Sequence, residues 1–194
     1  MTTQTQVLKQ PHSSLSKTKR LTTMALLAAV SVVLILFVRI PIFPAASYLV
    51  YDMADVPILL ASFLFGPVAG LEVLAVVCAI QGFLLGGDGW VGFLMHFLAS
   101  ATFILVACGF YRLCKQNKKG LIIGLVVATI ARAAVMVPLN LIFTVHFYGV
   151  PHDVVAAGLI PVTIPFNLLV SGCNSIIFLL LYQSLQFFLK QRQL

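Results

Sequence analysis

Two carboxylates interrupt an apolar stretch of this chain, Leu-Val-Tyr-Asp-Met-Ala-Asp-Val-Pro-Ile-Leu-Leu at residues 49–60. Asp52 and Asp55 lie three residues apart, which could suit a divalent-metal site, a catalytic pair, a helix start or a gate. Two carboxylates alone are a poor metal cage. Asp55, directly before Val56-Pro57, is typical of a helix N-cap with proline in the first turn, and we favour this interpretation. Asp52, which follows Tyr51, remains a candidate for binding.

Two asparagines predict a second site. Asn140 follows Pro138 by two residues and Asn167 follows Pro165 by two residues, each inside a long apolar segment. Helices broken at membrane depth often line a binding site, although a lone Asn can simply bond to a neighbouring helix. The repeated arrangement favours a shared polar pocket for a small, flat, hydrogen-bonding molecule. Nearby aromatic residues, some equally well explained by an aromatic belt, are Phe43, Tyr48, Tyr51, Trp90, Phe143 and Phe166.

The signals for catalysis are incomplete. Tyr51-Asp52 matches half of an intramembrane aspartyl protease signature, but Leu85 stands where the second half, Gly-x-Gly-Asp, requires its first glycine. The sequence has no His-Glu-x-x-His and no phosphate-binding glycine loop. His96 and His146 suit structural hydrogen bonds, and His96 is kept among the candidate ligands of the pocket. We therefore predict no enzymatic activity, cofactor or metal; an intramembrane enzyme and a scaffold protein are the alternatives from other classes.

The composition identifies a membrane protein. Of 194 residues, 61% are hydrophobic and 9% are charged, against roughly 25% charged in soluble domains. Continuous apolar runs favour helices over a barrel, and at about 20 residues per span the chain has room for about six. We predict an all-α, multi-pass membrane protein, with a disordered basic leader (1–20) and one transmembrane domain (21–194). The four cysteines contain no Cys-x-x-Cys pair and suggest neither a disulfide nor a metal.

The predicted spans lie near 21–39, 55–66, 68–85, 91–112, 121–147 and 160–189. Six spans place ten basic residues on one side, which the positive-inside rule makes cytoplasmic: Lys9, Lys17, Lys19, Arg20, Arg112, Lys115, Lys118, Lys119, Lys190 and Arg192. The net charge of +7 thus reflects topology rather than nucleic-acid binding. Asp52, Asp55, Asp88 and Asp153 are predicted at the outer face. Glu72 and Arg132, within spans, are expected to pair, unless Glu72 reaches the cytoplasmic interface instead.

The chain resembles the substrate-capture subunits (S-components) of energy-coupling factor (ECF) vitamin transporters, most closely the riboflavin type. The resemblance begins near Thr22 and is carried by Tyr-Asp-Met-Ala-Asp-Val-Pro-Ile-Leu-Leu-Ala-Ser-Phe-Leu-Phe-Gly-Pro-Val-Ala-Gly (51–70), Gly-Phe-Leu-Met-His-Phe-Leu-Ala-Ser (92–100), Val-Pro-Leu-Asn-Leu-Ile-Phe (137–143) and Ile-Pro-Phe-Asn-Leu-Leu (164–169). It implies a protein of a bacterial cell membrane with six helices, both termini cytoplasmic, and a loop at 40–54 that folds over the vitamin.

The resemblance also implies partners. Ala25 and Ala29, four residues apart, would dock a transmembrane coupling subunit by close helix packing, and two ATPase subunits would supply energy. One position departs from the riboflavin pattern: Val170 stands where riboflavin-type members commonly have lysine. Riboflavin is the expected vitamin, with another vitamin such as pantothenate as the alternative.

Overall fold

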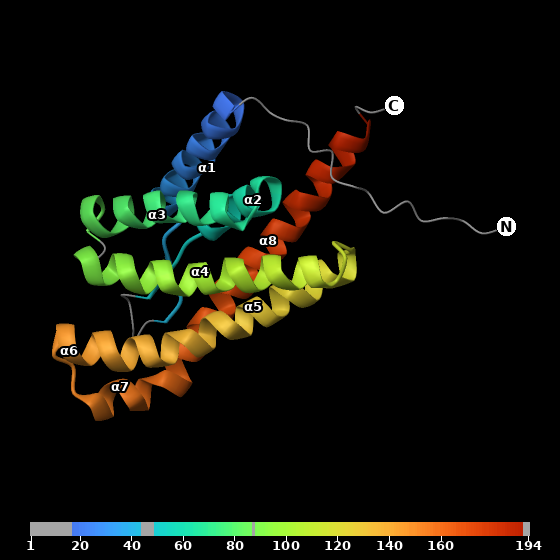
Figure 1. Ribbon diagram of the computed structural model, residues 1–194. Coiled ribbons are helices and arrows are strands. Elements are labelled where there is room, and N and C mark those ends of the chain that lie inside the picture. Colours follow the sequence, from blue (N-terminus) through green and yellow to red (C-terminus); the bar gives the residue numbers. More distant parts are fainter. Residues whose placement is uncertain (1–16, 44–48, 87, 192–194) are drawn as a thin grey trace.

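The computed structural model describes residues 17–43, 49–86 and 88–191, with side chains as far as Ser184 (Figure 1). The helices at the start of the chain are α1 (Lys17–Phe37), α2 (Asp55–Phe65), α3 (Pro67–Leu84) and α4 (Gly89–Leu113). They are followed by α5 (Lys118–Leu139), the π-helical turn η2 (Asn140–Thr144), α6 (Val145–Tyr148), α7 (His152–Gly158), the π-helical turn η3 (Leu159–Thr163) and α8 (Ile164–Gln191). Two short strands, β1 (Ile40–Pro41) and β2 (Val50–Tyr51), pair antiparallel between α1 and α2.

The predicted six-helix, all-α membrane architecture is confirmed. Five segments are long and apolar enough to span a membrane: Lys17–Phe37, Pro67–Leu84, Gly89–Leu113, Lys118–Tyr148 and His152–Ser184. The sixth, α2, has only 11 residues. The helix α1 begins at Lys17, so residues 17–20 are helical rather than part of a disordered leader; the rest of that leader lies outside the described residues.

Small residues allow the helices to approach closely. A Cβ atom on Gly124 of α5 would lie 2.9 Å from the carbonyl oxygen of Ala107 in α4. A Cβ atom on Gly70 of α3 would lie 1.8 Å from Ser62 Oγ in α2. These contacts leave no room for larger side chains, so glycine at 70 and 124 is part of the packing of α2 on α3 and of α4 on α5.

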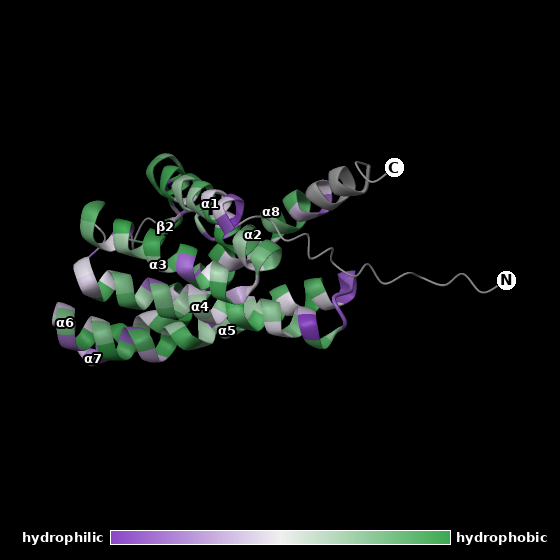
Figure 2. Ribbon diagram, turned by 45° about the horizontal axis from the view of Figure 1, so that its top comes forward, coloured by the Kyte–Doolittle hydropathy of each residue, from purple (hydrophilic) through white to green (hydrophobic). Residues whose placement is uncertain are grey.

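The ends of the bundle differ in charge. Figure 2 shows hydrophilic segments at the start of α1 and at the loop between α4 and α5, while the long helices are mainly hydrophobic. Figure 1 places that loop at the opposite end of the bundle from α6 and α7. Arg39 is an exception that the sequence reasoning overlooked: it is exposed, just after the outer end of α1.

The short helix α2 changes the predicted depth of the aspartates. At about 1.5 Å per residue, α1 is about 31 Å long but α2 only about 16 Å. The chain after α1 must therefore return into the bundle before α2 can begin. Asp55, the first residue of α2, is 3% exposed and lies inside the bundle. The prediction that Asp55 lies at the outer face was wrong, and the placement of Asp52 stays a prediction.

Candidate ligand-binding site

A buried ion pair between Arg132 and Asp55 lies at the centre of the bundle. The guanidinium Nη1 of Arg132 in α5 donates to Asp55 Oδ2 at the start of α2. Ser100 of α4 donates to the other carboxylate oxygen, Asp55 Oδ1, over 2.9 Å, and Arg132 Nη1 lies 3.2 Å from Ser100 Oγ. All three residues are at most 5% exposed. The interaction joins three helices at mid-depth.

Two predictions about these charges are corrected. Arg132 pairs with Asp55, and Glu72 is exposed on α3. Glu72 lies about 8 Å along α3 from its start, whereas Arg132 lies about 21 Å along α5, so the two are at different depths. Asp55 is also not the N-cap of α2, because the N-cap position is Ala54. The Asp55 carboxylate instead pairs with the buried guanidinium of Arg132. The position of Asp55 before Val56-Pro57 in the sequence did not indicate this pairing.

Residues 51–54 are fixed by hydrogen bonds to helices far away in sequence. The Tyr51 hydroxyl donates to Asn174 Oδ1 in α8 over 3.0 Å, and Asn174 Nδ2 donates to the Asp52 carbonyl over 3.2 Å. The Ala54 amide donates to Asp52 Oδ1, and Ser31 of α1 donates to the Ala54 carbonyl, both over 3.0 Å. Asp52 is therefore a local turn acceptor, and Asn174 and Ser31 are hydrogen-bond partners of this segment that the sequence reasoning missed.

The two predicted amides lie beside breaks in their helices. Asn140 opens the π-helical turn η2, and Asn167 follows η3 by four residues. Each side-chain nitrogen donates to a carbonyl four residues earlier: Asn140 to Met136 over 2.8 Å and Asn167 to Thr163 over 2.9 Å. π-helical turns frequently mark functional sites.

The amide oxygens differ in their partners. Asn140 Oδ1 accepts from Thr144 over 3.2 Å. Asn167 is 3% exposed, and within the described part of the chain its Oδ1 accepts no hydrogen bond. Asn140 lies in η2, directly after α5, and Asn167 lies in α8, which packs on α5. A shared pocket stays a prediction, and Asn167 Oδ1 is its available acceptor.

The remaining candidates occupy different environments. His96 is half-buried one turn before Ser100 on α4, and Phe166 is half-buried next to Asn167. Phe43 is half-buried after β1, and Tyr48 lies outside the described residues.

Trp90 is 50% exposed and packs edge-on against Phe147 of α6, with ring centroids 4.7 Å apart. Phe143 stacks on the same Phe147 ring, so Trp90 and Phe143 form part of an exposed outer rim, as expected of an aromatic belt.

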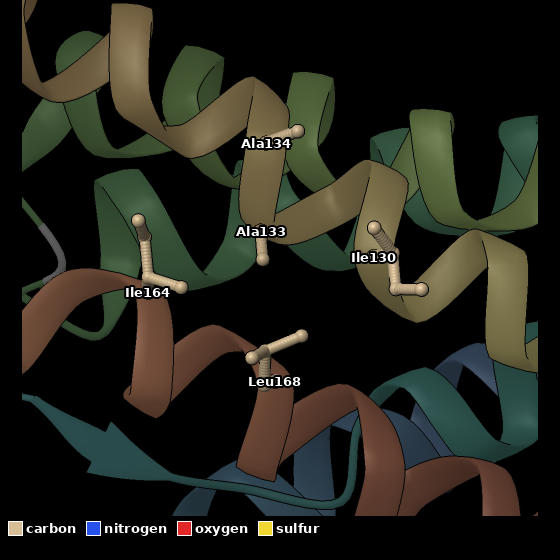
Figure 3. Close-up of a pocket in the computed structure, with 5 residues that line it drawn as sticks. All are labelled: Ile130, Ala133, Ala134, Ile164 and Leu168. Carbon is tan, nitrogen blue, oxygen red and sulfur yellow. The ribbon is translucent and has the colours of Figure 1, made fainter. Parts of the chain in front are cut away.

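An apolar groove of about 260 Å³ lies between α5 and α8. Figure 3 shows the five aliphatic residues that line it, which come from both helices: Ile130, Ala133, Ala134, Ile164 and Leu168. Ile130 is 58% exposed, so the groove opens on the face that contacts lipid. These side chains offer no hydrogen-bonding groups, and the groove cannot recognise the polar edge of a flat ligand.

Comparison with known proteins gives consistent matches. Residues 19–182 match the family described as ECF transporter, substrate-specific component. The riboflavin transporter RibU of Staphylococcus aureus is 37% identical over 188 residues, 92% of this chain and 96% of that protein. The riboflavin transporter FmnP of Bacillus subtilis is 26% identical over 187 residues, 91% of this chain and 97% of that protein.

A solved structure is also similar. It is described as "Structure and mechanism of the S component of a bacterial ECF transporter", with a TM-score of 0.76 and 41% identity. The match covers 89% of this chain and 98% of that chain. The similarity therefore extends over nearly the whole bundle.

The central ion pair predicts a specific pattern of stabilities. Arg132→Leu leaves the Asp55 carboxylate buried without a counter-charge and should lower the free energy of unfolding by about 3–5 kcal/mol. The double variant Asp55→Leu/Arg132→Leu should lose less than the two single variants together. Thermal unfolding in detergent measures both. Glu72→Gln, which removes an exposed charge from α3, is the control and should change stability little; equal losses for Glu72→Gln and Arg132→Leu would contradict the assignment.

Proposed function

The chain belongs to the substrate-specific components of ECF transporters, and from this premise we propose that it binds riboflavin in the outer half of the bundle for uptake into the cell. One observation carries the choice of vitamin. Relatives between 26% and 37% identical, aligned over about nine-tenths of the chain, are named riboflavin transporters. The solved S component at 41% identity supports the same architecture for the site.

The polar groups of the site suit a flavin. A flavin ring is flat, and its pyrimidine edge carries one N–H donor beside two carbonyl acceptors. Asn167 is a buried residue whose Oδ1 is the proposed acceptor for that N–H, and Asn140 is the second amide at a helix break. Tyr51 and Phe166 add aromatic surface, and Phe43 and His96 complete the proposed contacts. Asp52 contributes through its turn rather than through a charge facing the ligand.

The first helix supports a docking role. Its residues Met24, Ala28, Ser31 and Ile35 are buried against the bundle, whereas Ala25 and Ala29 are exposed. Two small residues spaced by four lie on one helical face and let another helix approach closely. We propose that this face docks a transmembrane coupling subunit, which joins two ATPase subunits in the complete transporter. The chain then acts in substrate capture, without catalysis of its own.

Binding can be tested through the two amides. Asn140→Leu and Asn167→Leu should each weaken riboflavin binding, because leaving a buried ligand group unsatisfied costs about 1–3 kcal/mol, or roughly five- to 150-fold in Kd. Quenching of riboflavin fluorescence by the purified protein measures the Kd. Leu168→Ala, on the groove side of α8, is the matched control and should bind as the unmutated protein does. An absence of quenching by the unmutated protein would refute the choice of riboflavin, and unchanged affinity in both Asn variants would refute the site.

Val170 gives a separate test of ligand identity. It is 5% exposed and lies one turn after Asn167, where riboflavin-type sequences commonly carry lysine. Val170→Lys should retain or strengthen riboflavin binding, because a bound flavin offers carbonyl oxygens to the ammonium group. Val170→Met, of similar length but uncharged, controls for volume. Weaker riboflavin binding by the lysine variant alone would instead favour a pocket shaped for another vitamin, such as pantothenate, since the ammonium would be buried without a partner.

Docking can be separated from binding. Ala25→Trp or Ala29→Trp should abolish vitamin uptake by cells that contain the coupling subunits, because the large ring prevents close helix approach. The isolated subunit should still bind riboflavin with its original Kd, since both alanines lie on the outer face of α1. Val30→Trp, an exposed position on another face of α1, tests whether any large ring has the same effect. A parallel loss of binding and uptake would show that this face is not a docking surface.

A further inference from the structure

We infer that Asn174 is a positioning residue, which holds Tyr51 and Asp52 against α8 and thereby sets how long the ligand stays bound. The inference rests on the proposed function for its ligand, but its structural basis is independent. Asn174 is fully buried, and its amide bonds to the Tyr51 hydroxyl and to the Asp52 carbonyl. Both partners lie more than 120 residues away in sequence.

The segment that contains Tyr51 needs such an anchor. Among its described residues, the ladder pairs are Ile40 with Tyr51 and Pro41 with Val50. An isolated two-stranded ladder of this length is marginal by itself, and Pro41 has no N–H to contribute. Among the hydrogen bonds of the described residues, those from Asn174 are the ones that join this segment to α8. The orientation of Tyr51 therefore depends on the Asn174 amide.

The position of Asn174 connects the anchor to the binding site. Asn167 and Asn174 are seven residues apart, about two turns or 10 Å along the same face of α8. Asn167 carries the available acceptor, and Asn174 carries the bonds to residues 51–52. One rigid helix face thus fixes both a proposed ligand contact and the segment that supplies Tyr51.

The start of α2 is anchored independently of Asn174. Ser31 of α1 bonds to the Ala54 carbonyl, and Asp55 bonds to Arg132 and Ser100. Removal of the Asn174 amide should therefore release residues 50–52 without releasing α2. This separation distinguishes a positioning role from a general contribution to folding.

The test compares Asn174→Leu with Ser31→Ala, which also removes a buried hydrogen bond from this region. Asn174→Leu should raise the riboflavin dissociation rate about tenfold, measured by stopped-flow recovery of fluorescence, and speed deuterium exchange at the amides of 50–53. Ser31→Ala should leave the dissociation rate unchanged. Tyr51→Phe should raise the rate by itself but add little in the Asn174→Leu background, because the two share one interaction.

The outcomes are distinguishable. Equal effects of Asn174→Leu and Ser31→Ala on dissociation and exchange would overturn the inference and leave Asn174 a structural residue. If the unmutated protein does not bind riboflavin, the proposed ligand is wrong, and deuterium exchange alone decides the role of Asn174. In that case, unchanged exchange at 50–53 in Asn174→Leu overturns the inference, and faster exchange confined to those amides supports the anchor.

Discussion

The buried pair of Arg132 and Asp55 is the constraint on which the rest of the bundle depends. A charge near the middle of a bilayer is costly, and a buried pair is stable only when its geometry and remaining hydrogen bonds are satisfied. Ser100 supplies one of those bonds. Arg132 is fixed in the middle of α5, so the Asp55 carboxylate must lie at the same depth to pair with it. The chain after α1 therefore runs back into the bundle, and α2 begins at mid-depth.

This constraint also creates the place for a ligand. A full-length second helix would fill the outer half of the bundle, but α2 occupies only the inner half. Among the described residues, the strands β1 and β2 lie between α1 and α2, and Tyr51 of β2 is bonded to Asn174 of α8. Breaks in the helices at η2 and η3 lie in the same half, beside Asn140 and Asn167. The ion pair at mid-depth and the polar groups of the outer half thus both follow from the shortness of α2.

The sequence predicted the elements better than their contacts. Hydropathy located the helices because each apolar run has one way to satisfy its backbone in lipid. The partner of Arg132 could not be deduced, since Asp55 and Glu72 were both available and depth depends on the path of the chain after α1. Asn174 was overlooked because no proline precedes it. Its spacing of seven from Asn167, on one helical face, is the signal that could have found it.

The first helix carries two roles on opposite sides. Ser31 on its buried face bonds to the Ala54 carbonyl, directly before the ion pair, while Ala25 and Ala29 lie exposed on the other face. A coupling subunit that packs on the exposed face need not disturb the polar interior. The contact through Ser31 nevertheless joins α1 to the segment that leads from Tyr51 into α2. Any movement of Ala54 must be accommodated by α1, so the helix proposed to dock the coupling subunit is also one that contacts the edge of the binding site.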